Sequence, residues 1–175
     1  MTLDRSLRPE ASEHAPYFER YTKLVPDGDV VETLARQSAE TLALLRGLSP
    51  EKAAYRYAPG KWSVKDVVGH FTDTERVFAY RALAIARGDQ GSLPGFDENV
   101  YAELARFDRL PLADVLAGFA VVRESSLTFL RQLDGEAWVR QGTANGHLTS
   151  TRAMAFIMAG HERHHVNVLR ERYLN

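Results

Sequence analysis

Apolar residues recur every three or four positions along four long segments of the chain, and this period limits the possible folds more than any other feature. The segments begin near Asp29, Ser63, Pro111 and Ser150. The period places apolar side chains on one side of an α-helix, where other helices must cover them. The alternation typical of strands is missing, apart from a weak signal at 138–141. The sequence therefore predicts an all-α fold, a four-helix bundle.

Residues with strong capping preferences support the helix boundaries. Asp29 is expected to be the N-cap of the first long helix, and Gly47 stands where its C-terminal cap belongs. Ser63 and Asp66 form a variant of the capping box at the start of the second helix. The Asp-Gly pair at 134–135 is expected to end the third helix.

The remaining segments suggest one domain with an N-terminal arm. Residues 1–28 contain three prolines and are expected to form an irregular arm that packs on the bundle through its aromatic residues. Residues 29–175 are expected to form the bundle domain. The stretch 88–110 is predicted to be a long crossover between the second and third helices, with a short helix around 98–105.

Charge and composition exclude several classes of partner. The 175 residues include 22 basic and 23 acidic side chains, so no strong field attracts nucleic acid or an anionic membrane. The chain has no apolar run of about 18 residues and no secretory signal pattern, and we expect a cytoplasmic protein. It also lacks cysteine, so a metal would need His, Asp or Glu as ligands.

Three histidines are expected to face the core. His161 and His165 lie about 40° apart on one helix, within its apolar sector. His70 lies on the inner side of the second helix. Each buried imidazole nitrogen without a partner costs roughly 1–3 kcal/mol, and a shared metal would satisfy one nitrogen of each ring. His164 points about 60° to the other side of His161 and is the weaker candidate.

The residues alone leave other interpretations open. A single inward histidine is more often a hydrogen-bonded core residue than a ligand, so a bundle without metal is the alternative. The letters at 161–165 match the zinc-protease motif H-E-x-x-H, but an all-helical chain offers no strand to bind an extended peptide. Asp73 and Glu162 are expected to be surface or capping charges, or an interhelical charge in the case of Glu162. The stretch 96–99 is a candidate to close over the site, or an ordinary connection.

Two segments resemble the DinB/YfiT-like superfamily. They are K-W-S-V-K-D-V-V-G-H-F-T-D-T-E at 61–75 and G-H-E-R-H-H at 160–165. The resemblance extends from about Asp29 to Leu174. It implies the family's four-helix bundle, a nickel- or zinc-type ion on His70, His161 and His165, and a homodimer. Iron and manganese also suit three histidines.

The resemblance implies an activity only in outline. Relatives include S-transferases that use low-molecular-weight thiols, and metal-dependent hydrolases. We therefore expect a metal-dependent enzyme, a thiol-dependent S-transferase or a hydrolase of small molecules, in which the metal activates a thiol or water. The alternative is a non-catalytic, stress-associated metal-binding bundle. No catalytic residue is assigned, and the three histidines are expected to be metal ligands.

Overall fold

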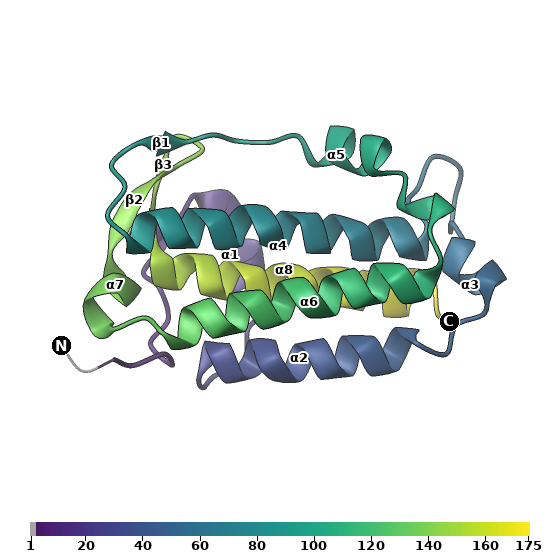
Figure 1. Cartoon of the computed structure of the whole chain (residues 1–175), viewed down its shortest axis with the longest axis horizontal. Coiled ribbons are helices and arrows are strands. Elements are labelled where there is room, and N and C mark those ends of the chain that lie inside the picture. Colours follow the sequence, from purple (N-terminus) through teal and green to yellow (C-terminus); the bar gives the residue numbers. More distant parts are fainter. Residues whose placement is uncertain (1–2) are drawn as a thin grey trace.

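Four long helices run side by side along the long axis of the molecule (Figure 1). The computed structural model describes residues 3–175. The long helices are α2 (Val30–Leu45), α4 (Val64–Ala86), α6 (Leu112–Arg131) and α8 (Thr151–Arg172). Two clusters of buried apolar residues fill the space between them. The predicted four-helix bundle is therefore confirmed. In residues 3–175, no helix combines the length and apolar character needed to cross a membrane.

The caps predicted for α2 and α4 are present. The Asp29 carboxylate accepts two backbone N–H groups in the first turn of α2, at 2.7 and 3.2 Å. Ser63 and Asp66 form the expected capping box on α4. Ser150 accepts a backbone N–H at 3.0 Å and caps α8. Each cap satisfies N–H groups that have no partner within the helix.

The structure corrects two expectations about the region between α6 and α8. Helix α6 ends at Arg131, and Asp134 instead caps a short helix, α7 (Gly135–Val139). A small sheet follows, although the sequence indicates no strand apart from the weak signal at 138–141: β2 (Gln141–Ala144) pairs antiparallel with β3 (His147–Ser150), and β1 (Ser92–Leu93) pairs parallel with β2. The two-residue turn Asn145-Gly146 has positive φ angles of 50° and 76°. Asn-Gly favours such hairpin turns, and the sequence analysis overlooked this signal.

The crossover and the N-terminal segment flank the α4–α8 side of the bundle. Between α4 and α6 lie β1, the short helix α5 (Glu98–Ala105) and a 3-10 turn, η3 (Phe107–Arg109). The helix at 98–105 is therefore confirmed, and Figure 1 shows the crossover passing along α4. The N-terminal elements are η1 (Ala11–Glu13), η2 (Pro16–Phe18) and α1 (Glu19–Thr22), and α3 (Pro50–Ala54) follows α2. The Glu13 carboxylate pairs with Arg152 on α8. The division into an arm at 1–28 and a domain at 29–175 stays a prediction.

One buried arginine on α6, Arg123, links all four long helices. Its guanidinium donates to both carboxylate oxygens of Glu75 on α4, at 2.9 and 2.6 Å. It also donates to Glu162 on α8 and to the carbonyl oxygen of Leu34 on α2, each at 2.8 Å. Glu162 accepts a further hydrogen bond from Thr41 on α2 at 2.7 Å. Because the cluster is buried and well hydrogen-bonded, it holds the helices in one relative position.

The environment of this cluster keeps its cation charged. Burial alone would lower the pKa of Arg123, but the carboxylates of Glu75 and Glu162 raise it above its usual value. Burial also raises the pKa of Glu162, while Arg123 and Thr41 oppose that change. Inside the core, the carboxylates therefore stabilise the charged form of the guanidinium, and the guanidinium stabilises the charged form of the carboxylates.

The variant Arg123→Met is expected to destabilise the protein by about 3–5 kcal/mol, because two buried carboxylates lose their cation. Urea unfolding followed by circular dichroism measures this change. Arg131→Met, on the same helix, is the matched control: its side chain is 46% exposed and lies 3.5 Å from Glu32. Such an exposed pair contributes less than about 1 kcal/mol. Equal losses in the two variants would contradict the role assigned to Arg123.

Candidate metal centre

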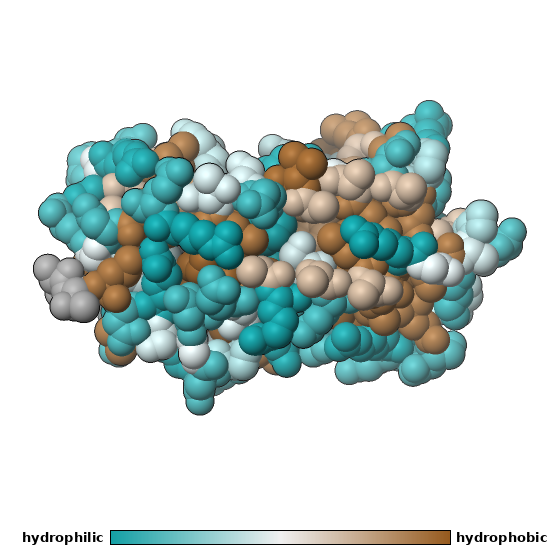
Figure 2. Space-filling model, turned by 60° about the horizontal axis from the view of Figure 1, so that its bottom comes forward, coloured by the Kyte–Doolittle hydropathy of each residue, from teal (hydrophilic) through white to brown (hydrophobic). Residues whose placement is uncertain are grey.

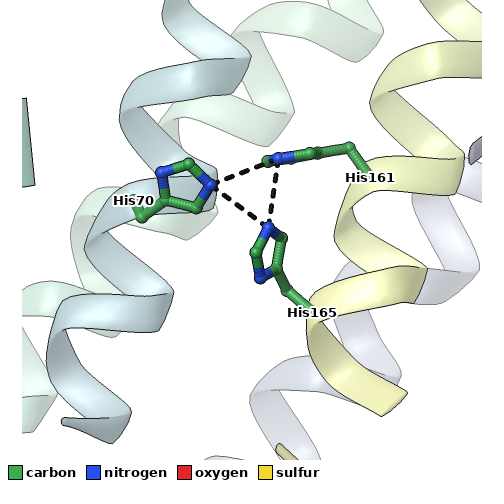
Figure 3. A group of neighbouring side chains, drawn as sticks. All are labelled: His70, His161 and His165. Atoms are coloured by element: carbon green, nitrogen blue, oxygen red, sulfur yellow. Dashed lines mark hydrogen bonds between the residues drawn. The ribbon is translucent and has the colours of Figure 1, made fainter. Parts of the chain in front are cut away.

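The three predicted histidines meet between α4 and α8. The Nε2 atom of His70 lies 3.2 Å from Nε2 of His161 and 3.1 Å from Nε2 of His165. The third side of the triangle, between His161 and His165, is 3.1 Å. Figure 3 shows one ring entering from α4 and two from successive turns of α8, with their Nε2 atoms converging. Their role as metal ligands stays a prediction, and the geometry identifies Nε2 as the atom of each ring that would bind the ion.

Hydrogen bonding alone does not account for this triangle. A neutral imidazole Nε2 either carries a proton and donates, or carries a lone pair and accepts. Three such atoms can form at most two donor–acceptor pairs among themselves, so the third contact brings two like groups together. One ion at the centre would instead satisfy all three lone pairs. The geometry therefore favours a metal site over a set of mutually hydrogen-bonded histidines.

The distances also suit a transition-metal ion. Metal–imidazole bonds are about 2.0–2.1 Å long, so nitrogens on one ion lie roughly 2.9–3.4 Å apart for right-angled to tetrahedral arrangements. The three separations in this structure, 3.1 to 3.2 Å, fall in that range. Within the described residues, these three side chains form a group that could hold a metal ion.

Aromatic rings enclose the histidines on both sides. A Cβ atom on Gly160 would lie 2.0 Å from the backbone oxygen of Tyr21, so the glycine permits the close approach of α1 to α8. The Tyr21 ring consequently lies 5.2 Å from the His161 ring. On the opposite side, the Trp62 ring lies 4.6 Å from the His70 ring. These rings contribute to the burial of His70 and His161, which are 7% and 6% exposed.

Burial keeps the three imidazoles neutral. Desolvation lowers the pKa of His70 to about 4, with a smaller contribution from the charge of His164. The pKa values of His161 and His165 are also well below the ordinary value, first because of burial and then because of repulsion by neighbouring histidines. Neutral imidazoles are the form that binds metals. The site is thus prepared for a cation without having to release protons at neutral pH.

The histidines form one part of the wall of a cavity of about 420 Å³. Residues from the N-terminal segment, α4, the crossover, the hairpin and α8 contribute to this wall. Its apolar part is largely aromatic, and its polar residues include Thr74, Arg81, Glu98, Asn99, Asn145 and His147. The stretch 96–99 supplies three of the lining residues, so this part of the crossover borders the same cavity as the histidines. A cavity of this size suits a small molecule.

The other candidate side chains lie outside the triangle. His164 is half-buried, with its ring 5.1 Å from that of His165 and 5.4 Å from that of Tyr21. The Asp73 carboxylate pairs with Arg76 at 2.6 Å. Glu162 is buried in the Arg123 cluster, so the expectation of a surface or capping charge was wrong and the interhelical alternative was right. Glu162 therefore does not occupy the position of the general base in a zinc protease.

The residues that support the site were not among those predicted from the sequence. Arg123 lies in the apolar stripe of α6, four residues after Phe119 and four before Leu127. Glu75 lies in the apolar stripe of α4 in the same way. A charged residue at a core position of an amphipathic helix is a signal for a buried ion pair. The sequence could indicate such positions, but not their partners.

A helical bundle with a largely buried group of three histidines on a cavity defines a class of candidate metal-binding proteins. The sequence signature of the DinB superfamily matches residues 33–169, and the chain belongs to this superfamily. YfiT from Bacillus subtilis, described as "a probable metal-dependent hydrolase with an unusual four-helix bundle topology", has a similar structure, with a TM-score of 0.75 and 16% sequence identity. The similarity covers 95% of this chain and 91% of YfiT, and it shows the shared fold. No curated protein matched in the sequence comparison.

The low histidine pKa values predict that the metal-free protein loses stability as the pH falls. An unfolded histidine has a pKa of about 6.5, whereas that of folded His70 is about 4. Between these values the unfolded chain binds more protons, so the free energy of unfolding decreases with falling pH and levels off above about pH 6.5. For His70 alone the loss is on the order of 3 kcal/mol.

Urea unfolding of the metal-free protein across this pH range measures the effect. Carboxylates titrate in the lower part of the range, so His70→Gln serves as the reference chain. The difference in unfolding free energy between wild type and His70→Gln isolates the imidazole. A difference that does not change with pH would contradict a neutral, buried His70.

Proposed function

We propose that this protein is a metal-dependent enzyme in which His70, His161 and His165 hold one divalent transition-metal ion through their Nε2 atoms. The observation that carries the proposal is the triangle of three Nε2 atoms, 3.1 to 3.2 Å apart, in the wall of a cavity, with His70 and His161 buried and His165 half-buried. Three protein ligands leave coordination positions open, which is typical of catalytic rather than structural sites. Nickel or zinc is the proposed ion, and iron and manganese are compatible with the same ligands.

The bound ion would lower the pKa of a water or thiol and so generate a nucleophile at neutral pH. The chain's own contribution is the environment. Its neutral imidazoles present lone pairs, and the Tyr21 and Trp62 rings exclude bulk water around them. The cavity of about 420 Å³ holds a small molecule beside the histidines.

Two reaction types fit this site. In hydrolysis, water adds to an electrophilic carbon and the leaving group departs with a proton; the description of YfiT as a probable hydrolase supports this type. In S-transfer, the thiol must come from a low-molecular-weight cosubstrate, because the chain has no cysteine. The alternative from another class is a non-catalytic, stress-associated protein in which the ion only ties α4 to α8.

Metal binding is tested on chelator-treated protein by calorimetric titration with nickel and with zinc. We expect one ion per chain. His70→Ala, His161→Ala and His165→Ala should each weaken binding by more than the roughly 10–100-fold that loss of an outer hydrogen-bond partner costs. His164→Ala, beside the triangle, is the control and should bind normally. Wild-type affinity in any of the three triangle variants would refute the assignment.

A second measurement separates an enzyme from a metal-stabilised bundle. The metal-free and metal-loaded proteins are compared for hydrolysis of small esters and amides and for addition of thiols to electrophiles. The enzyme proposal expects turnover that appears with the metal and disappears in His70→Ala. A melting temperature that rises with metal while no reaction responds would favour the non-catalytic alternative.

We also propose a homodimer, on the basis of the family resemblance. Several large apolar side chains are exposed, among them Leu104 on α5 at 74% and Val121 on α6 at 70%. On the face shown in Figure 2, apolar residues are more continuous over one half of the molecule than over the other. Light scattering at micromolar concentration is expected to give twice the chain mass. A mass near 19.6 kDa would contradict the dimer.

A further inference from the structure

Arg81 on α4 is a buried cation without an anionic partner. Its side chain is 3% exposed and lines the same cavity as the three histidines. One nitrogen donates to the backbone oxygen of Pro94 at 2.6 Å. Within residues 3–175, no carboxylate forms a salt bridge with it. The other two buried arginines, Arg123 and Arg152, are both paired with glutamates.

The surroundings of Arg81 compensate its charge only in part. Arginine stays protonated in proteins, so burial costs free energy unless an anion faces it. The guanidinium carbon lies 5.8 Å from the ring centroids of both Phe78 and Phe96, where aromatic faces attract a cation. Burial nevertheless lowers the pKa of Arg81, because no carboxylate opposes that effect. An anionic group in the cavity would supply the missing partner.

Thr74 provides a second polar group without a partner. Its hydroxyl oxygen is buried, forms no hydrogen bond in the described chain and belongs to the cavity lining. A helical threonine can donate to the carbonyl four residues earlier, as Thr72 does to Val68 at 2.7 Å. Thr74 leaves that option unused. Within the described residues, its hydroxyl therefore keeps an unused capacity for hydrogen bonding.

His70, Thr74 and Arg81 lie along one side of α4. At about 100° per residue, Thr74 is displaced by about 40° from His70 and Arg81 by about 20°. The rise of a helix places the Cα atoms of His70 and Arg81 about 16 Å apart. An arginine side chain spans part of this distance, and the aromatic residues Phe18, Phe78 and Phe96 line the wall of the same cavity.

We propose that Arg81 binds an anionic group of the ligand, so that the cavity takes small molecules with a carboxylate or phosphate at one end and an apolar body. The anion would lie away from the reacting end at the histidines, with Thr74 hydrogen-bonding the ligand between them. The role given to the histidine end rests on the proposed function. The remaining charged lining residue, Glu98, is exposed at the rim and leaves the buried end of the cavity positive.

The experiment measures binding of three probes of similar size by calorimetry: phenylacetate, phenyl phosphate and the neutral phenylacetamide. Metal-free protein is used at about pH 8, where the imidazoles are neutral and do not attract anions. At least one anion is expected to bind about tenfold or more tightly than the amide, as for hydrogen bonds to a charged group. The tighter of the two anions identifies the carboxylate or the phosphate as the preferred group.

Variants assign this preference to Arg81. Arg81→Met should reduce the ratio of anion to amide affinity to about one, whereas Arg81→Lys should keep part of it, because the charge remains but the planar fork is lost. Arg87→Met, at the C-terminal end of the same helix and outside the cavity lining, is the matched control and should bind like wild type. Circular dichroism confirms that each variant is folded.

The proposal fails if wild-type protein binds the amide as tightly as both anions, or if folded Arg81→Met keeps the anion preference. If Arg81→Met does not fold, the wild-type comparison of probes and the Arg81→Lys variant still decide. Both results are independent of metal. If the protein prefers anions but binds no metal at the histidines, only the proposed function is overturned. If it binds metal at the histidines but shows no preference for anions, only the role of Arg81 is overturned.

Discussion

The hydrogen-bonded charge cluster around Arg123 is the constraint on which the other features of this bundle depend. Its guanidinium joins Glu75 on α4 to Glu162 on α8 and also reaches α2. Glu162 follows His161 in the chain, and Glu75 lies little more than one turn after His70. A buried ion cluster tolerates little displacement, because each broken bond leaves a desolvated charge. The cluster thus keeps α4 and α8 at the separation that lets the three Nε2 atoms meet.

The cavity side of the bundle differs from the Arg123 cluster in how completely its polar groups are hydrogen-bonded. Every side chain of the Arg123 cluster is hydrogen-bonded, whereas within residues 3–175 the histidine nitrogens, the Thr74 hydroxyl and the Arg81 guanidinium lack complete partners. Buried polar groups without partners are costly, so natural proteins keep few of them. Thr74 and Arg81 bring incompletely satisfied polar groups to the same cavity wall as the three histidines, and this is the physical basis for placing the chemistry there. The stable cluster and the incomplete one lie on the same pair of helices, so the first supports the second.

Local signals predicted most of the fold. The apolar period, the Asp29 and Ser63 caps and the helix at 98–105 depend on residues close together in the chain, and each appeared as expected. The hairpin was missed because an apolar alternation was sought, while the decisive signal was the Asn145-Gly146 turn. The histidine set came from spacing and family resemblance, and the structure brings the same three rings together.

Helical spacing predicted that the apolar stripes and the three histidines turn inward, since a period of 3.6 residues assigns each position to a face whatever the helix packs against. Partners across helices depended on how the helices pack. Glu162 has the same helical position whether it meets solvent, a metal or Arg123, and the choice follows from which residue of α6 faces it. Likewise, the sequence marks Arg81 as a cation, but its lack of a carboxylate arises from the folded surroundings. Contacts of this kind join residues far apart in the chain and depend on how the helices pack. A local sequence pattern therefore cannot predict them.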